Sequence, residues 1–390
     1  MTTTTQNDLI EVPRGLKGVV VTETELGDVR GDEGFFHYRQ YSAVELAERR
    51  GLEDVWFLGL FGWLPDDAER AAFGADVAAA RHLPPEVAEA LPVIAAGGGS
   101  PLDGLRTVLS LLGSARGLRP VYDLDDDTRR RDAIGLAAAV PTVLAGLHRL
   151  RAGLVPLEPR DDLGHAAAYL TMLTGAEPTP EQARAVEQYL VLTVDHGFNA
   201  STFTARVIAS TGADVAACLV GAIGALSGPL HGGAPSRALD TLDDIGTVER
   251  IDPWVRQRVL SGDRIMGFGH AVYRTEDPRS RLLRGVAERL SEGDPAASEL
   301  VELAEQVERR VVQILAELKP GRELHTNVEF YAGVVMSLCG LPRELFTPTF
   351  AVARVIGWSA NVLEQARDPK IIRPSARYVG PPPPQPVPAR

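Results

Sequence analysis

A chain of 390 residues, of which 45% are hydrophobic and 24% charged, has the composition of a globular protein that can bury a sizeable core. Its net charge of −12 argues against a nucleic-acid partner or an anionic membrane surface, because both attract basic proteins. The two cysteines, Cys218 and Cys339, lie in apolar runs, which favours buried thiols over a disulfide or a metal site. The sequence contains neither a recognisable signal peptide nor an apolar stretch of ~20 residues near the start, so a cytoplasmic location is expected.

In chain order, the first predicted element is a short β-hairpin over residues 18–38, where apolar and polar residues alternate around a Gly-Asp-Glu-Gly turn. Helical patterns dominate from Ser42 onwards. Pro141 should end or kink the helix in which it lies. Helices are predicted over residues 43–50, 65–81, 132–151, 179–193, 199–210, 253–260, 295–318 and 347–365.

Charged residues alternate along residues 295–318 around a regularly spaced apolar stripe, which predicts a long amphipathic helix with a solvated face. The proline-rich end, residues 379–390, should be polyproline II or disordered. We interpret it as a surface tail or as an arm that lies across a partner subunit. The sequence lacks GxxxxGK[ST], HExxH, CxxC and GxSxG, and no GxGxxG stands between a strand and a helix.

Three histidines stand in glycine-rich surroundings: His196 in DHGFNASTF, His231 in GPLHGGA and His270 in GFGHAVYR. Glycine beside a functional side chain lets the backbone turn sharply or approach a ligand closely. Glu329, in HTNVEFYAG, is the only acid between Glu323 and Glu344, and burying a carboxylate is costly unless something uses or pairs it. Together these residues indicate a functional site.

Five stretches occur here in the order in which the citrate synthases have them, and the chain resembles that family over essentially its whole length. They are DHGFNASTFTARV, GALSGPLHGGA, MGFGHAVYRTEDPR, TNVEFYAG and IIRPSARYVG. The resemblance implies an all-α, two-domain fold with a short N-terminal β-hairpin. It also implies a homodimer, a large domain formed by residues 1–231 and 337–390, and a small domain formed by residues 232–336.

The resemblance implies the condensation of acetyl-CoA with oxaloacetate and water to citrate and CoA, a step of the tricarboxylic acid cycle, through an enol and citryl-CoA. The CoA thioester is a substrate, and neither a cofactor nor a metal is expected. By the same resemblance, His231 hydrogen-bonds the thioester carbonyl and His270 donates to the oxaloacetate carbonyl. Glu329 takes the methyl proton, and His196 assists oxaloacetate binding.

Arg279, Arg354 and Arg373 match the family's carboxylate clamps, with Arg373 donated across the dimer interface; guanidinium groups bind carboxylates bidentately. Arg354 lies in the apolar run TFAVARVIGW and needs a carboxylate, which is either the substrate or a buried acid. Arg274 and the backbone of Met266, Gly267 and Gly269 should border the CoA, since loop amides attract phosphates.

Glu329 departs from the family, because most members have Asp at this position. The extra methylene moves the carboxylate by over 1 Å, and a misplacement of about 1 Å can cost about 10²-fold in rate. Either the pocket is reshaped around Glu, or activity is weak or directed at another acyl-CoA. The alternatives are a 2-methylcitrate synthase that uses propionyl-CoA, whose motifs are the same, and a catalytically silent homodimer that binds CoA or a dicarboxylate.

Overall fold

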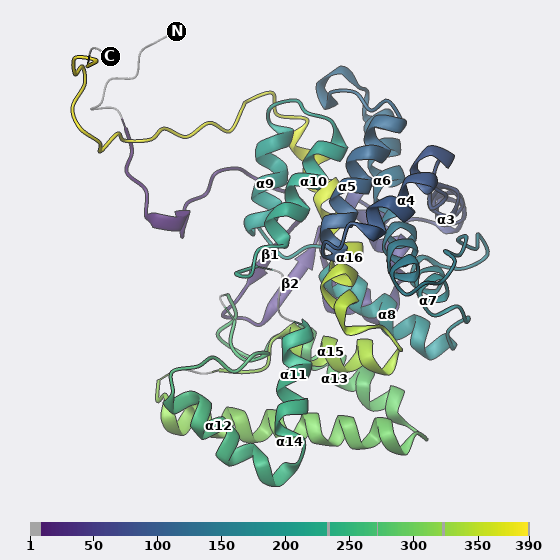
Figure 1. Ribbon diagram of the computed structural model, residues 1–390, viewed down its shortest axis with the longest axis vertical. Helices are drawn as coiled ribbons and strands as arrows, with labels where there is room; N and C mark the ends of the chain where they lie inside the picture. The colour runs from purple at the N-terminus through teal and green to yellow at the C-terminus, as the bar shows by residue number, and fades with distance from the viewer. Residues whose placement is uncertain (1–8, 232–234, 271, 322–323, 389–390) are drawn as a thin grey trace.

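The computed structural model describes residues 9–231, 235–270, 272–321 and 324–388. Within these ranges it contains sixteen α-helices and one antiparallel sheet of three short strands. The predicted all-α fold with an N-terminal hairpin is therefore confirmed (Figure 1). The predicted domain boundary at residue 232 lies outside the described residues.

The hairpin is shorter than the sequence predicts. Strand β1, Gly27–Arg30, pairs antiparallel with β2, Phe35–Tyr38, so that Gly27 faces Tyr38 and Arg30 faces Phe35. The Gly-Asp-Glu-Gly turn joins them, and Gly34 takes the left-handed conformation (φ 61°) that a tight turn requires. A third strand, β3 (Tyr41–Ser42), adds to β2. Residues 18–26, which we expected to belong to the hairpin, form no strand.

Most helices pack together in the upper part of Figure 1, around two long buried helices, α6 and α16. Four of them, α1, α3, α8 and α9, begin directly after a residue type that commonly caps helices. These N-cap residues, Ser42, Asp66, Thr179 and Asn199, each accept a hydrogen bond from a first-turn N–H group. The group comprises α1 Ala43–Arg49, α2 Leu52–Phe61, α3 Asp67–Ala80, α4 Pro85–Ala96, α5 Pro101–Ala115, α6 Asp126–Arg151, α7 His165–Thr174, α8 Pro180–Thr193, α9 Ala200–Ala209, α10 Val215–Leu226 and α16 Phe346–Gln365.

Helix α6 continues through Pro141 as one helix of 26 residues, so of the two effects that we expected, an end or a kink at this proline, the end is wrong. A proline in a helix interior costs about 3 kcal/mol. Residues 133–147 are buried throughout, against α3, α4, α5, α7 and α16, and this packing outweighs the cost. Among the described residues, α6 is also the one helix long and apolar enough to cross a membrane, and 83% of its apolar window is buried inside the protein.

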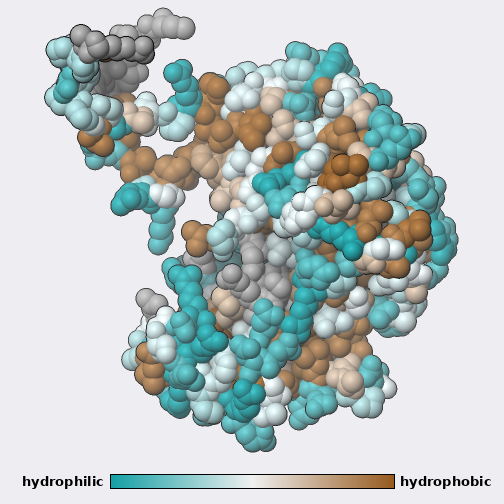
Figure 2. Space-filling model, in the orientation of Figure 1, coloured by the Kyte–Doolittle hydropathy of each residue, from teal (hydrophilic) through white to brown (hydrophobic). Residues whose placement is uncertain are grey.

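Five helices form the lower part of Figure 1: α11 Pro235–Ile245, α12 Ile251–Leu260, α13 Pro278–Ser291, α14 Pro295–Leu318 and α15 Val328–Leu338. They pack mainly on one another, while α13 and α15 also contact α8 of the upper group. The prediction of an amphipathic helix over residues 295–318 agrees with α14. Its apolar stripe is buried, and hydrophilic residues cover most of the lower surface in Figure 2. The division into two domains stays a prediction.

The first and last segments of the described residues project from the body as two extended arms (Figure 1). Arg377 of the C-terminal arm forms an ion pair with Glu11 of the N-terminal arm. Large apolar side chains on the arms are exposed, among them Val20 (85%) and Val379 (89%). Apolar surface is more often buried in a contact than left in water when it gathers on one segment.

Candidate active site

Two loops, one with residues 267–269 and one with residues 325–327, meet where the lower helices face the upper group. Their backbones position the predicted site residues. Thr326 pairs with Phe268 as an isolated β-bridge, the Gly269 N–H donates to the His325 carbonyl (2.8 Å), and the Asn327 N–H donates to the Gly267 carbonyl (2.9 Å). Gly267 has φ 84°, and a Cβ there would lie 2.9 Å from the Phe330 ring. Glycine is therefore required for the glycine-rich loop to lie against the start of α15.

Glu329 is the second residue of α15, and its N–H donates to the side chain of Asn327, the N-cap (3.1 Å). Burial raises the pKa of its carboxyl group to about 7, with Arg279 opposing that rise and Asp277 adding to it. The carboxylate accepts no hydrogen bond from any residue that the structure describes. A carboxyl group that is half ionised near neutral pH suits a general base.

His270 has a defined tautomer. Its Nδ1 accepts hydrogen bonds from the backbone N–H groups of Val272 and Tyr273, both at 3.0 Å. Burial and the neighbouring Arg279 lower its pKa to about 4, so the ring is neutral and carries its proton on Nε2. Nε2 lies 3.3 Å from Nη2 of Arg279. Both atoms are donors, so the pair presents two N–H groups to one acceptor from a ligand.

His196 lies beside His270, as predicted. The two rings pack edge to face with centroids 5.5 Å apart, and Nε2 of His196 is 3.0 Å from the Tyr273 hydroxyl. Burial lowers the pKa of His196 well below its ordinary value, and Arg279, His270 and Arg354 add to this. Both imidazoles are therefore uncharged at neutral pH.

His231 follows α10, and its Nε2 lies 2.7 Å from the Ser201 hydroxyl at the start of α9. Burial first, and then Arg354, lowers its pKa, so this ring is also neutral. The Ser201 hydroxyl has one proton and two acceptors in reach, Nε2 and the Asn199 side-chain oxygen (2.8 Å). When Ser201 donates to Nε2, the imidazole proton sits on Nδ1 and is available to a ligand. Asn199 keeps the N–H of Thr202 in that case.

Arg279 is buried and fixed by an acid that precedes it in the sequence. Its Nε and Nη2 donate to the two oxygens of Asp277, at 3.0 and 2.8 Å. Both side chains are at most 3% exposed. Asp277 also accepts the N–H of Val328, the first residue of α15, so one carboxylate links Arg279 to the helix that carries Glu329. The remaining N–H groups of Arg279 are free for a substrate carboxylate.

Arg354 is 2% exposed and lies in the middle of α16. Its Nε donates to the Thr193 carbonyl (3.0 Å), and its guanidinium group lies 4.4 Å from the centre of the Phe350 ring. No carboxylate of the described chain is within ion-pair distance, so the alternative of a salt bridge to a buried acid is not found. Burial lowers the pKa of Arg354, which Asp195 partly offsets.

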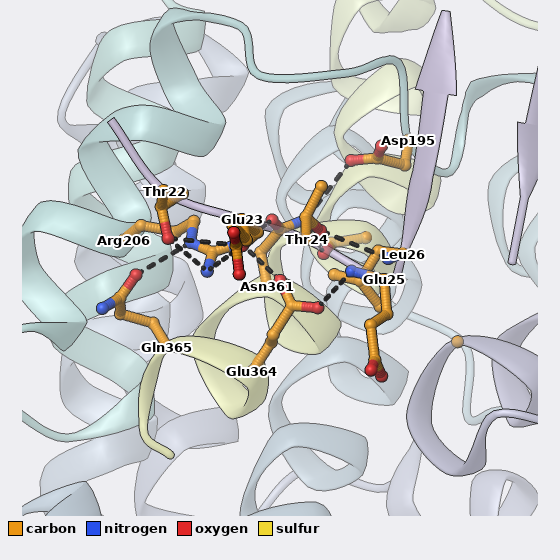
Figure 3. A network of polar contacts seen from close by, with 12 residues as sticks. Thr22, Glu23, Thr24, Glu25, Leu26, Asp195, Arg206, Asn361, Glu364 and Gln365 are labelled. Carbon is orange, nitrogen blue, oxygen red and sulfur yellow. Dashed lines mark hydrogen bonds and ion pairs between the residues drawn. The ribbon is translucent and has the colours of Figure 1, made fainter. Parts of the chain in front are cut away.

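Asp195, the residue before His196, belongs to a polar network (Figure 3). The Asp195 carboxylate accepts hydrogen bonds from the Gly197 N–H (3.2 Å) and the Asn361 side chain (3.3 Å), and burial raises its pKa to about 6. Asn361 in turn accepts from Arg206, which also pairs with Glu364 at 2.5 Å. The network ties α9 and α16 to the N-terminal segment, residues 22–26, and holds the loop that carries His196.

A cavity of about 440 Å³ adjoins the site, and His270 is one of its lining residues. Three of the residues predicted to border CoA, Met266, Gly267 and Gly269, line this cavity together with Arg264 and Lys319; binding of CoA there stays a prediction. No role was predicted for these two cations, although Arg264 stands directly before the glycine-rich loop. Arg274 is exposed and does not line the cavity; its backbone N–H donates to the Gly31 carbonyl (3.1 Å).

Arg373 is not brought to the other site residues. It lies exposed on the C-terminal arm and has no hydrogen bond or ion pair to any residue of the described ranges. Its donation to a partner subunit stays a prediction. Within those ranges no group of three His, Cys, Asp or Glu side chains is arranged to hold a metal ion. Ser201 and Asp277 lie within the quoted motifs and contact His231 and Arg279, but neither received a predicted role. The spacing of Asp277 and Arg279, two positions apart, is the signal that could have revealed the second.

A base of raised pKa, neutral imidazole donors and buried guanidinium groups are the groups that an enzyme needs to make a carbon–carbon bond next to a thioester. Such an enzyme is a condensing acyltransferase. Sequence comparison agrees with this class. The sequence-family model described as citrate synthase, C-terminal domain, matches residues 15–375 of this chain. The chain therefore belongs to the citrate synthase family.

The relatives cover nearly the whole chain. The citrate synthase of Deinococcus radiodurans is 39% identical over 370 residues, which span 95% of this chain and 96% of the relative. The crystal structure of the Pyrobaculum aerophilum citrate synthase superposes with a TM-score of 0.88 at 33% identity, covering 100% of this chain and 98% of that one. A Thermoplasma acidophilum citrate synthase, solved with carboxymethyl coenzyme A and oxaloacetate, also gives 0.88 at 28% identity, with 97% and 98% covered.

Proposed function

We propose that this protein condenses acetyl-CoA with oxaloacetate and water to give citrate and CoA. The observation that carries the proposal is the state of Glu329. Its carboxyl group has a pKa of about 7 and belongs to the first turn of α15, and Asp277 connects the start of this helix to the buried Arg279. The Thermoplasma relative was solved with a CoA analogue and oxaloacetate, and the relatives reported above are all called citrate synthases. These names favour acetyl-CoA over the propionyl-CoA of a 2-methylcitrate synthase.

In the proposed mechanism, Glu329 removes a proton from the acetyl methyl group while the Nδ1–H of His231 stabilises the enolate oxygen. The methyl carbon then forms a bond to the ketone carbon of oxaloacetate. The ketone oxygen becomes a hydroxyl by taking the Nε2 proton of His270. Water hydrolyses the resulting citryl thioester and releases CoA.

The substrate's carboxylates need cations, because the net charge of the protein repels an anion. Arg279 and Arg354 would bind them on this chain, with His196 beside the keto acid. Arg373 would come from the partner subunit of a homodimer. The exposed apolar arms support such a dimer, because a second subunit would cover them.

Several further expectations belong to the same proposal. Residues 232–336 would form a small domain that borders the cleft, and the rest of the chain the large one. Arg264 and Lys319 would attract the CoA phosphates at the cavity of Met266, Gly267 and Gly269, with Arg274 at its outer edge. The enzyme would act in the cytoplasm, in the tricarboxylic acid cycle, and without a cofactor or metal ion.

The variant Glu329→Gln tests the proposal, with CoA release followed by a thiol reagent. We expect turnover to fall by about 10²–10⁴-fold, the usual contribution of a general base, with oxaloacetate binding by calorimetry largely unchanged. Glu344→Gln, an exposed acid whose side chain is 59% accessible, is the control and should behave as the parent.

Near-normal turnover of Glu329→Gln would refute the assignment of the base. Faster release from propionyl-CoA than from acetyl-CoA by the parent would instead indicate a 2-methylcitrate synthase. Binding of both substrates without release of CoA from either acyl-CoA would indicate a silent binding protein.

A further inference from the structure

The hydroxyl of Tyr189, on α8, is a buried donor without a partner. Tyr189 is 1% exposed, and its hydroxyl forms no hydrogen bond within the described ranges. Two other buried tyrosines nearby are satisfied: Tyr169 contacts the Thr349 hydroxyl at 2.9 Å, and Tyr38 donates to the Val191 carbonyl at 2.9 Å. Buried tyrosine hydroxyls nearly always find a partner, so an unpaired one requires an explanation.

The surroundings of Tyr189 belong to the proposed active site. Helix α8 packs against α13, α15 and α16, which carry Arg279, Glu329 and Arg354. Burial is the largest influence on the Tyr189 hydroxyl and raises its pKa, so the group stays protonated and can donate. The charge that acts on it most strongly is Glu329, and the two arginines come next.

Among the described residues, the Glu329 carboxylate is an acceptor that lacks a donor, whereas the Tyr189 hydroxyl is a donor that lacks an acceptor. The carboxylate accepts no hydrogen bond within the described chain, although a buried carboxylate is costly without donors. Glu is longer than the Asp that most of the family has here, by one methylene or about 1.5 Å of reach. The longer side chain can therefore extend from the start of α15 towards α8, where an unused donor lies.

We propose that Tyr189 is a positioning residue, whose hydroxyl donates a hydrogen bond to the Glu329 carboxylate in the substrate-bound enzyme and holds this longer base at the acetyl methyl group. The proposal rests on the assignment of Glu329 as the base. The hydroxyl also stabilises the ionised form of Glu329, which is the form that accepts a proton. Tyr189 thus compensates for the longer acid that this chain has in place of the family's Asp.

Several other acids on α8, and on the helices that pack against α8 and α15, already have fixed partners. Asp277 binds Arg279, and Glu308 on α14 accepts from Thr326 and Tyr331, both at 2.6 Å. Asp240 and Asp243 on α11 pair with Arg343, and Glu187 on α8 pairs with Arg184. Arg354 and Tyr169 face Tyr189 but carry no proton that titrates near pH 7. Removal of the Tyr189 hydroxyl therefore changes one donor and leaves the other charges in place.

The test is Tyr189→Phe, with Tyr169→Phe as a matched control because that hydroxyl is buried, paired and not part of the proposed site. For Tyr189→Phe we expect kcat for CoA release to fall about tenfold, since hydrogen bonds to charged groups are the stronger kind. The acid limb of the kcat–pH profile should move to higher pH by about one unit. The KM for oxaloacetate should stay within about twofold, and Tm should not fall, because no native hydrogen bond is lost. Tyr169→Phe should lower Tm and leave the pH profile unchanged.

A double-mutant cycle with Glu329→Asp isolates the contact. The shorter carboxylate should not reach Tyr189, so adding Tyr189→Phe to the Glu329→Asp variant should change kcat by less than about twofold. Equal effects in the parent and in that variant, an unshifted acid limb, or a loss expressed mainly in the KM for oxaloacetate would overturn the inference; the last would assign the hydroxyl to the substrate. If Glu329→Gln is inactive and Tyr189→Phe behaves as the parent, this inference alone fails. If Glu329→Gln stays active, the proposed base fails first.

Discussion

The buried pair of Asp277 and Arg279 predicts a large and specific loss of stability for Asp277→Asn. Each oxygen of Asp277 accepts two N–H groups: one from the backbone and Nε of Arg279, the other from Nη2 of Arg279 and the backbone of Val328. Whichever way the asparagine side chain turns, its NH₂ group faces two donors. Arg279, 3% exposed, also loses its counter-charge. Breaking a buried ion pair by removing one partner costs about 3–5 kcal/mol, a large part of a typical free energy of unfolding of about 5–15 kcal/mol.

Urea unfolding at one protein concentration measures this loss, and Asp252→Asn supplies a matched comparison. Asp252 also binds an arginine through both oxygens, Arg310, but the two side chains are 39% and 38% exposed. An exposed ion pair is screened by solvent and contributes little to stability, so Asp252→Asn should unfold almost as the parent does. If both variants lost the same free energy of unfolding, the argument from burial would be refuted.

Three more outcomes follow from the site. Arg354→Leu should weaken oxaloacetate binding in calorimetry by about 10²-fold or more, since each charge-assisted hydrogen bond is worth about 1.5–3 kcal/mol. Its Tm should not fall, because the arginine has no carboxylate partner in the described chain. A large drop in Tm would reveal a structural role for Arg354. Ser201→Ala should lower kcat about tenfold with the oxaloacetate KM unchanged, because Nε2 of His231 loses the donor that favours the Nδ1–H tautomer; an unchanged kcat would contradict that. Burial raises the pKa of Glu329 from 4.5 to about 7, so the folded state holds this proton more tightly and loses stability as pH rises through that window. Glu329→Gln should therefore unfold at higher urea than the parent at pH 8, by up to about 3 kcal/mol, and show little gain at pH 4.5; equal stability at pH 8 would argue against burial of the charge.

Local signals predicted the helices that have caps and one apolar face. Asn199 precedes α9, Thr179 precedes α8, and α14 alternates charges around an apolar stripe. Helices such as α10 were not predicted, because VAACLVGAIGAL is apolar on all sides and has no helical period to detect. Pro141 was misleading, since the packing that surrounds α6 comes from helices far away in the sequence.

The candidate site was predictable as a set of residue types but not as a set of contacts. Glycine context singled out His196, His231 and His270, and apolar context singled out Arg354 and Glu329. Which atom faces which partner depends on the tertiary structure. His270 owes its tautomer to two backbone N–H groups, and the guanidinium group of Arg354 lies over Phe350 rather than beside an acid. An unpaired hydroxyl, as in Tyr189, leaves no trace in a sequence.

The hydrogen bond from the Glu25 N–H to the Glu364 side chain (2.8 Å) joins positions 339 residues apart. During synthesis it therefore forms only after nearly the whole chain has been made. A ribosome adds about 5–20 residues per second. The segment at Glu25 therefore leaves the ribosome roughly 20–70 s before its partner on α16 exists. During that interval the segment at Glu25 lacks its partner on α16, and a chaperone or a nascent neighbour is free to bind it.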